Sequence, residues 1–109
     1  MDDSHRAPQS YAARLREEAR LQALRTLAEA PEYTATDVLL RAALREQGLS
    51  IGMDAVRVEL FWLNENGLVV TQRVGGPAGL LMATLTERGL DIANGTSQVP
   101  GVARPRPGA

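Results

Sequence analysis

The chain has 109 residues, of which 44% are hydrophobic and 4% aromatic, and this composition accommodates one domain with an aliphatic, largely helical core. It contains no cysteine, which excludes disulfides, thiolate metal sites and cysteine nucleophiles. Its net charge of −1 is unusual for a nucleic-acid-binding protein, because such proteins usually carry a basic surface.

The N-terminal segment, residues 1–9, is polar and has no hydrophobic periodicity, which predicts a flexible arm. It is too acidic for a secretory signal, and no apolar run in the chain approaches the roughly 20 residues of a membrane span. We therefore expect a cytoplasmic protein with no membrane partner.

The next two segments have helical periodicity. Ser10 is expected to cap a helix over residues 11–30, which ends at Pro31. Thr36 is expected to cap a second helix that ends at Gly48, a residue that readily adopts the left-handed conformation of a helix C-terminus. The predicted buried face of this second helix consists of Leu39, Leu40, Ala43 and Leu44.

A third helix follows after a tight turn. We expect Ser50 to cap it, Val56, Leu60 and Leu63 to face the core, and Asn66-Gly67 to end it. The short turn between the second and third helices is typical of a helix-turn-helix.

The last ordered part of the domain is predicted to contain two strands and a helix. Residues 68–74 and 80–85 have strand composition, and the Gly/Pro loop at 75–79 suits a hairpin. Thr86 is expected to cap a final short helix that ends at Asn94-Gly95.

This order of elements predicts a mainly α fold with a small β-hairpin wing (α+β), a winged helix-turn-helix with an extra N-terminal helix, over residues 10–95. The tail, residues 96–109, is rich in Gly, Pro and Ser and too poor in apolar surface to fold alone. We expect it to be disordered, with docking on the domain or contact with DNA as alternatives.

The chain resembles bacterial winged-helix proteins of the ArsR-like type. The residues that carry the resemblance are Leu49-Ser50, Val56, Leu60, Leu63, Asn66-Gly67-Leu68-Val69 and Leu85-Thr86-Glu87-Arg88-Gly89. In size, early helix and Pro/Arg tail it is also similar to the small winged-helix proteins encoded by Mu-like phages and prophages. The ArsR-like resemblance implies DNA binding and a homodimer. Metal-sensing members use Cys or His clusters, which this sequence lacks, so no metal site or cofactor is carried over.

The favoured function is accordingly a small DNA-binding transcriptional regulator that acts on double-stranded DNA. In this fold the third helix is the one expected in the major groove, with the wing beside it. The candidate DNA contacts are Ser50, Arg57, Thr71, Gln72 and Arg73.

The outward face of the third helix favours a different partner. Opposite its core positions lie Asp54, Val58, Phe61, Trp62 and Glu65. The carboxylates would repel phosphates, and large exposed aromatic side chains more often mark protein contacts. The alternative function is a protein–protein interaction module or a phage structural or assembly protein, with an interface at Phe61, Trp62 and Leu15. The other interpretation is that one of the two aromatic rings packs under the wing or the first helix.

The sequence offers little for catalysis. Its single histidine, His5, lies in the predicted arm, where no base could be held in position. Gly75-Gly76 lacks the lysine and the following helix of a phosphate-binding loop. We therefore expect neither an enzyme nor a cofactor.

Overall fold

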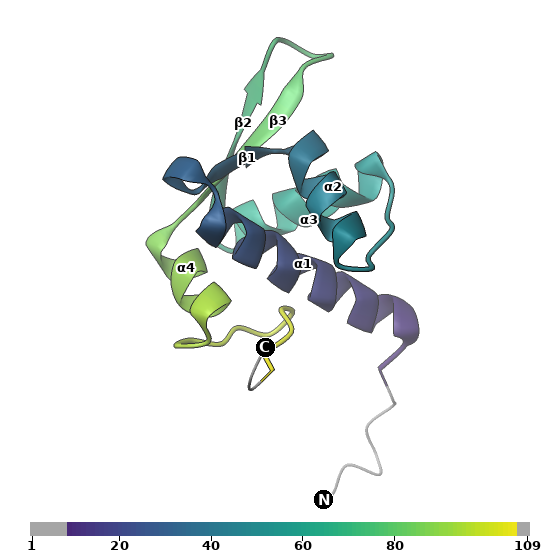
Figure 1. Cartoon of the computed structure of the whole chain (residues 1–109), viewed down its shortest axis with the longest axis vertical. Coiled ribbons are helices and arrows are strands. Elements are labelled where there is room, and N and C mark those ends of the chain that lie inside the picture. The colour runs from purple at the N-terminus through teal and green to yellow at the C-terminus, as the bar shows by residue number, and fades with distance from the viewer. Residues whose placement is uncertain (1–8, 107–109) are drawn as a thin grey trace, which may run out of the picture.

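The computed structural model of the protein describes residues 9–106, and the expected arm, with His5, lies outside them except for Gln9 (Figure 1). The helices are α1 (Tyr11–Glu29), α2 (Asp37–Glu46), α3 (Met53–Glu65) and α4 (Glu87–Asn94), and the strands are β1 (Thr34–Thr36), β2 (Val69–Val74) and β3 (Leu80–Leu85), with a 3₁₀ turn η2 (Pro31–Tyr33). The fold class is α+β, as the sequence predicts. None of the helices within residues 9–106 combines the length and apolar character that crossing a membrane requires.

Most of the predicted helix ends are confirmed. The hydroxyl of Ser10 accepts a hydrogen bond from the Ala13 amide at 3.0 Å, and Thr36 and Thr86 cap α2 and α4 in the same way. Gly48 follows the end of α2 with a φ of +88°, the left-handed conformation expected of a glycine at this position.

Two details of α2 and α3 differ from the prediction. Ser50 does not cap α3, because the preceding Leu49 is buried in the core and the chain needs residues 50–52 to reach the first turn; the cap residue is Gly52. Leu39 is 62% exposed rather than buried. The buried position at the start of α2 is taken by Asp37, whose carboxylate is satisfied by hydrogen bonds.

The sheet has three strands in the order β1-β3-β2, with both pairs antiparallel. Strand β1 is not among the elements predicted above, and Thr34–Thr36 pairs with residues 82–84 of β3. The far end of β3 pairs only with β2, so the β2–β3 hairpin extends away from the helices (Figure 1).

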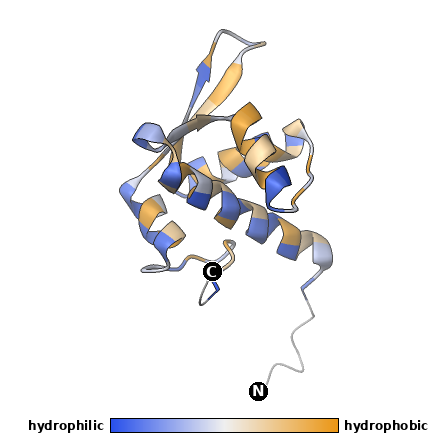
Figure 2. Ribbon diagram, viewed as in Figure 1, coloured by the Kyte–Doolittle hydropathy of each residue, from blue (hydrophilic) through white to orange (hydrophobic). Residues whose placement is uncertain are grey.

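The core is formed by aliphatic side chains from the helices and from one face of the sheet. The three residues predicted to face inward from α3, namely Val56, Leu60 and Leu63, are buried. They meet leucines of α1 and α2 and the inward residues of β2 and β3. The hydrophobic stretches that Figure 2 shows in the first turn of α2 and in β3 contribute residues to this core, while Val38, Leu39 and Leu80 of the same elements are exposed.

A cluster of paired charges links α1 to α3. The Nε of Arg20 donates to Glu59 at 2.7 Å, and the Nε of Arg16 donates to the other carboxylate oxygen of Glu59 at 3.0 Å. Arg20 and Glu59 are both buried. The guanidinium of Arg20 also lies 4.0 Å from the ring centre of Trp62, a cation–π contact, and donates to the carbonyl of Gly101 at 2.9 Å.

The described part of the tail, residues 96–106, is docked on the domain. Val102 is buried, and the amide of Ala103 donates to the carbonyl of Glu17 on α1 at 3.2 Å. Together with the hydrogen bond from Arg20 to Gly101, these contacts hold the tail against α1, although the tail has few apolar side chains. Residues 107–109 lie outside the described range.

Replacing Glu59 with Gln should lower the free energy of unfolding by about 3 kcal/mol, because the buried guanidinium of Arg20 loses its carboxylate partner. Urea denaturation followed by the fluorescence of Trp62, the single tryptophan of the chain, measures the loss. The exposed Glu65→Gln variant is the control and should stay within about 0.5 kcal/mol of the wild type. Equal effects of the two substitutions would contradict the buried pair.

Replacing Gly101 with Ala should destabilise the protein by about 1–3 kcal/mol, because its φ of +100° strains a side-chain-bearing residue and the new Cβ would lie 2.6 Å from the ring of Trp62. Gly76→Ala is the matched control, since its φ is +79° but no heavy atom lies within 4 Å of the added Cβ. If both variants lose the same stability in urea, the contact between Gly101 and Trp62 contributes nothing.

Candidate functional site

The outward face of α3 is a single row of four residues, here called the α3 row: Asp54, Val58, Phe61 and Glu65. Their spacing places all four on one side of a helix. Val58 is 51% exposed and Phe61 is 41% exposed, and both carboxylates are exposed. The α3 row is therefore apolar in its middle and acidic at both ends.

The arginine of α3 itself is compensated. Arg57 lies on the flank of the row, and its Nε donates to the carboxylate of Asp37 at 2.7 Å. Asp37 is fully buried at the start of α2. By contrast, neither Asp54 nor Glu65 forms an ion pair within residues 9–106. The row thus presents two uncompensated negative charges.

A groove of about 370 Å³ lies between α1 and α3, here called the α1–α3 groove. It is lined by Ala12, Leu15, Arg16, Ala19, Ile51, Ala55, Val58 and Glu59. Its walls are mostly apolar, and its two charged side chains pair with each other, although Glu59 is shared with Arg20 and the cluster keeps one positive charge. Val58 belongs both to the groove and to the α3 row, so the two form one continuous surface.

The residues proposed for a protein interface are only partly brought together. Leu15 lines the α1–α3 groove and Phe61 lies in the α3 row. Trp62 does not join them. It turns toward α1, where it packs against Arg20 and Gly101.

The residues proposed for DNA contact are distributed over different environments. Ser50 is exposed in the loop before α3, and Arg57 is paired with Asp37. On β2, the amide of Thr71 donates to the side chain of Asn64 at 3.2 Å. Because successive strand residues point to opposite faces, Gln72 lies on the other face of the hairpin from Thr71 and Arg73.

The hairpin face that carries Gln72 has no charged residue. From the pairing register, it contains Val70, Gln72, Val74, Leu80, Met82 and Thr84. Val70, Val74 and Leu80 are all more than two-fifths exposed. This face of the hairpin offers phosphates no cationic group.

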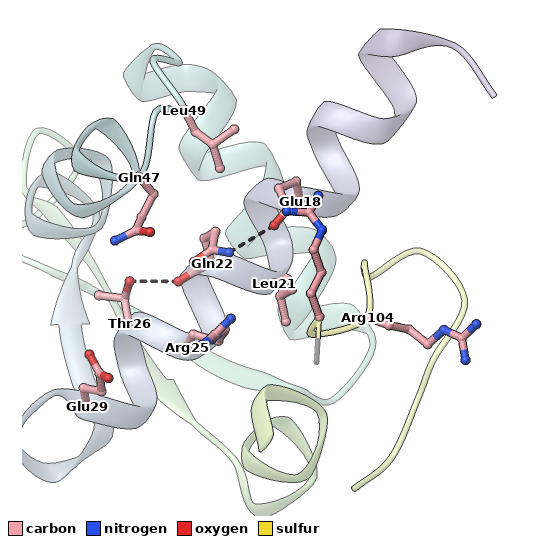
Figure 3. Close-up of a pocket in the computed structure, with 10 residues that line it drawn as sticks. Glu18, Leu21, Gln22, Arg25, Thr26, Glu29, Gln47, Leu49 and Arg104 are labelled. Atoms are coloured by element: carbon pink, nitrogen blue, oxygen red, sulfur yellow. Dashed lines mark hydrogen bonds and ion pairs between the residues drawn. The ribbon is translucent and has the colours of Figure 1, made fainter. Parts of the chain in front are cut away.

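A second, polar hollow of about 480 Å³ lies beside α1 (Figure 3). Its lining residues are Glu18, Leu21, Gln22, Arg25, Thr26, Glu29, Gln47, Leu49, Arg104 and Arg106. Glu18 accepts a hydrogen bond from Gln22 at 3.0 Å and lies 3.9 Å from Arg106, while the side chain of Arg104 points away from them in Figure 3. Because acidic and basic side chains are mixed here, the hollow does not present a single charge to a ligand. Within residues 9–106, no group of His, Asp and Glu is placed to hold a metal ion.

Comparison with known proteins identifies relatives of this chain. No protein-family profile matches it. It is 38% identical over 95 residues to gp26 of Escherichia phage Mu, which covers 87% of this chain and 95% of gp26. It is 35% identical over 81 residues to a protein of Haemophilus influenzae, which covers 74% of this chain and 76% of that protein.

Both relatives are named as uncharacterized proteins, so the likeness carries no activity with it. The relative in phage Mu agrees with the relation to phage proteins that the sequence suggests. The aligned region covers nearly the whole of both proteins. The chain belongs to the family of the phage Mu protein gp26.

Proposed function

We propose that this chain is a winged helix-turn-helix protein that binds another protein through the α3 row and the α1–α3 groove, as an interaction or assembly module of a phage-related system. In this reading α2 and α3 form the helix-turn-helix and the β2–β3 hairpin is the wing. One observation carries the proposal: the exposed face of α3 holds two apolar side chains between two unpaired carboxylates.

The chemistry of the α3 row favours a protein over DNA. Val58 and Phe61 are each about half exposed, so completing their burial would contribute about 1 kcal/mol per side chain. Asp54 and Glu65 would meanwhile be repelled by a phosphate backbone, and carboxylates read only the cytosine amino group among base edges. The neighbouring groove adds a preformed apolar surface, which is the usual core of a protein interface.

Double-stranded DNA is the second candidate, and the pair of Arg57 with Asp37 favours it. A buried carboxylate holds the guanidinium in place, which would let its remaining nitrogen atoms meet a phosphate near Ser50. On the wing, the exposed Gln72 and Arg73 could add contacts, with Thr71 beside them. The homodimer implied by the ArsR-like resemblance belongs to this second candidate.

Replacing both Val58 and Phe61 with Asp should weaken a complex with a specific protein partner. The full chain, immobilised and exposed to extract from cells that produce the cognate phage, is expected to retain one protein that mass spectrometry identifies and that binds again when purified. The double variant should weaken this binding at least about tenfold, because the apolar centre of the interface is lost.

The matched control places the same charges on the hairpin instead, in the Val70→Asp/Val74→Asp variant, because these side chains are about equally exposed. It should leave the complex intact, and circular dichroism should show both variants folded. Undiminished binding by the Val58/Phe61 variant would refute the proposed interface.

The DNA candidate gives a separate expected result. If the protein acts on duplex DNA, fluorescence anisotropy at low salt should show binding to a labelled duplex. Arg57→Ala and Arg73→Ala should each weaken that binding and lower its salt slope by about one. Arg88→Ala, an exposed change on α4, is the control and should have little effect. Tight duplex binding that Arg57→Ala and Arg73→Ala weaken and Arg88→Ala does not would make DNA, rather than a protein, the favoured partner.

A further inference from the structure

We propose that the partner segment seated on the α3 row is a basic amphipathic helix, with cationic side chains on both sides of an apolar centre. This inference rests on the proposed function, since it names the chemistry of the protein that the same surface binds. It follows from the distribution of charge along α3, from the symmetry of the α3 row and from the shape of the adjoining groove.

The uncompensated charges of α3 are all negative and lie at the two ends of the row. The helix carries four charged residues, and two of them are neutralised inside the fold: Arg57 by Asp37, and Glu59 by arginines of α1. Asp54 and Glu65 remain, exposed and without an ion pair in the described part of the chain. They are eleven residues apart, which corresponds to about 16 Å along a helix.

The symmetry of the row disfavours a second copy of this chain as the occupant. Asp54 precedes Val58 by four residues, and Glu65 follows Phe61 by four residues. In a two-fold antiparallel contact centred between Val58 and Phe61, each Asp54 would therefore face Glu65 of the other copy. Like charges facing each other across an interface cost several kcal/mol. A partner segment with two cationic side chains spaced like Asp54 and Glu65 would pair with these carboxylates instead of repelling them. A basic segment of a different protein is therefore the complementary partner.

The groove beside the row fits a helix. Three of the residues that line it are alanines, Ala12, Ala19 and Ala55, and small side chains allow a helix to approach closely. Leu15 and Ile51 supply larger apolar surface beside them. A partner helix of about three turns would span the α3 row, with its apolar side chains at helical spacing entering the groove.

The probes for this inference are two synthetic helical peptides of 18 residues. Both carry leucines at helical spacing, and two flanking positions eleven residues apart hold Arg in the basic peptide and Glu in the acidic one. Fluorescence anisotropy with the full chain at low salt should show the basic peptide binding at least about tenfold more tightly, and added salt should shrink the difference because it screens exposed charges.

Charge reversal on the protein sharpens the test. The variant Asp54→Arg/Glu65→Arg should prefer the acidic peptide, and the milder Asp54→Asn/Glu65→Gln variant should bind both peptides alike, which guards against misfolding of the first. The control Glu29→Arg/Glu46→Arg makes the same change in net charge at two other exposed carboxylates and should keep the preference for the basic peptide.

Three results would overturn the inference. Equal binding of the two peptides by the wild type, or binding of neither, would show that the α3 row does not select a basic helix. Self-association that sedimentation detects and that Val58→Asp/Phe61→Asp removes would assign the row to a second copy, while the proposed function as a protein-binding module would stand. Duplex binding that depends on Arg57 and Arg73 would overturn the inference and the proposed function together.

Discussion

The guanidinium of Arg20 helps to fix how α3 is rotated, and the proposed binding surface depends on that rotation. It is buried between the carboxylate of Glu59 and the ring of Trp62, which lie three residues apart and therefore on the same side of α3. With that flank held against α1 and with Val56, Leu60 and Leu63 facing the core, the side that carries Val58 and Phe61 faces solvent. A buried guanidinium without these partners would be costly, so this arrangement of the two helices has few alternatives.

The elements of this fold were largely readable from local signals, and helical periodicity also placed the exposed residues of the α3 row correctly, whereas the contacts that bury Arg20 and hold Trp62 were not readable. Ser10 and Thr36 cap helices by accepting hydrogen bonds from amides three residues away, and Gly48 ends a helix through its own backbone conformation. These helix ends can therefore be predicted from a short stretch of sequence. The hydrogen bonds from Arg20 to Glu59 and to Gly101 join residues that are 39 and 81 positions apart in the chain. Helical or strand periodicity does not predict contacts between residues so far apart. For this reason the sequence could not tell that Trp62 is held inside the fold while Phe61 stays outside. The pairing of Asp37 with Arg57 and the docking of the tail were hidden in the same way.

The fold and the partner are separate questions for this protein. The order of helices and strands constrains the backbone, but it leaves the exposed side of α3 free to vary, because Val56, Leu60 and Leu63 hold the helix in place whatever lies opposite. Here that side combines carboxylates with apolar side chains, and the arginine of α3 is paired with Asp37. The relation to gp26 of phage Mu places the chain in a family, and the surface chemistry of α3 is the basis of the proposed protein partner.

The hydrogen bond from the amide of Thr71 to the side chain of Asn64 has a consequence for solubility. Strand β2 is an edge of the sheet, and an exposed edge beside apolar residues such as Val70 can recruit strands from other molecules. The side chain of Asn64 occupies the outward amide near the base of β2. An incoming strand would have to displace it before it could pair there. The protein can thus expose the uncharged face of its hairpin without offering its whole edge as a template for aggregation.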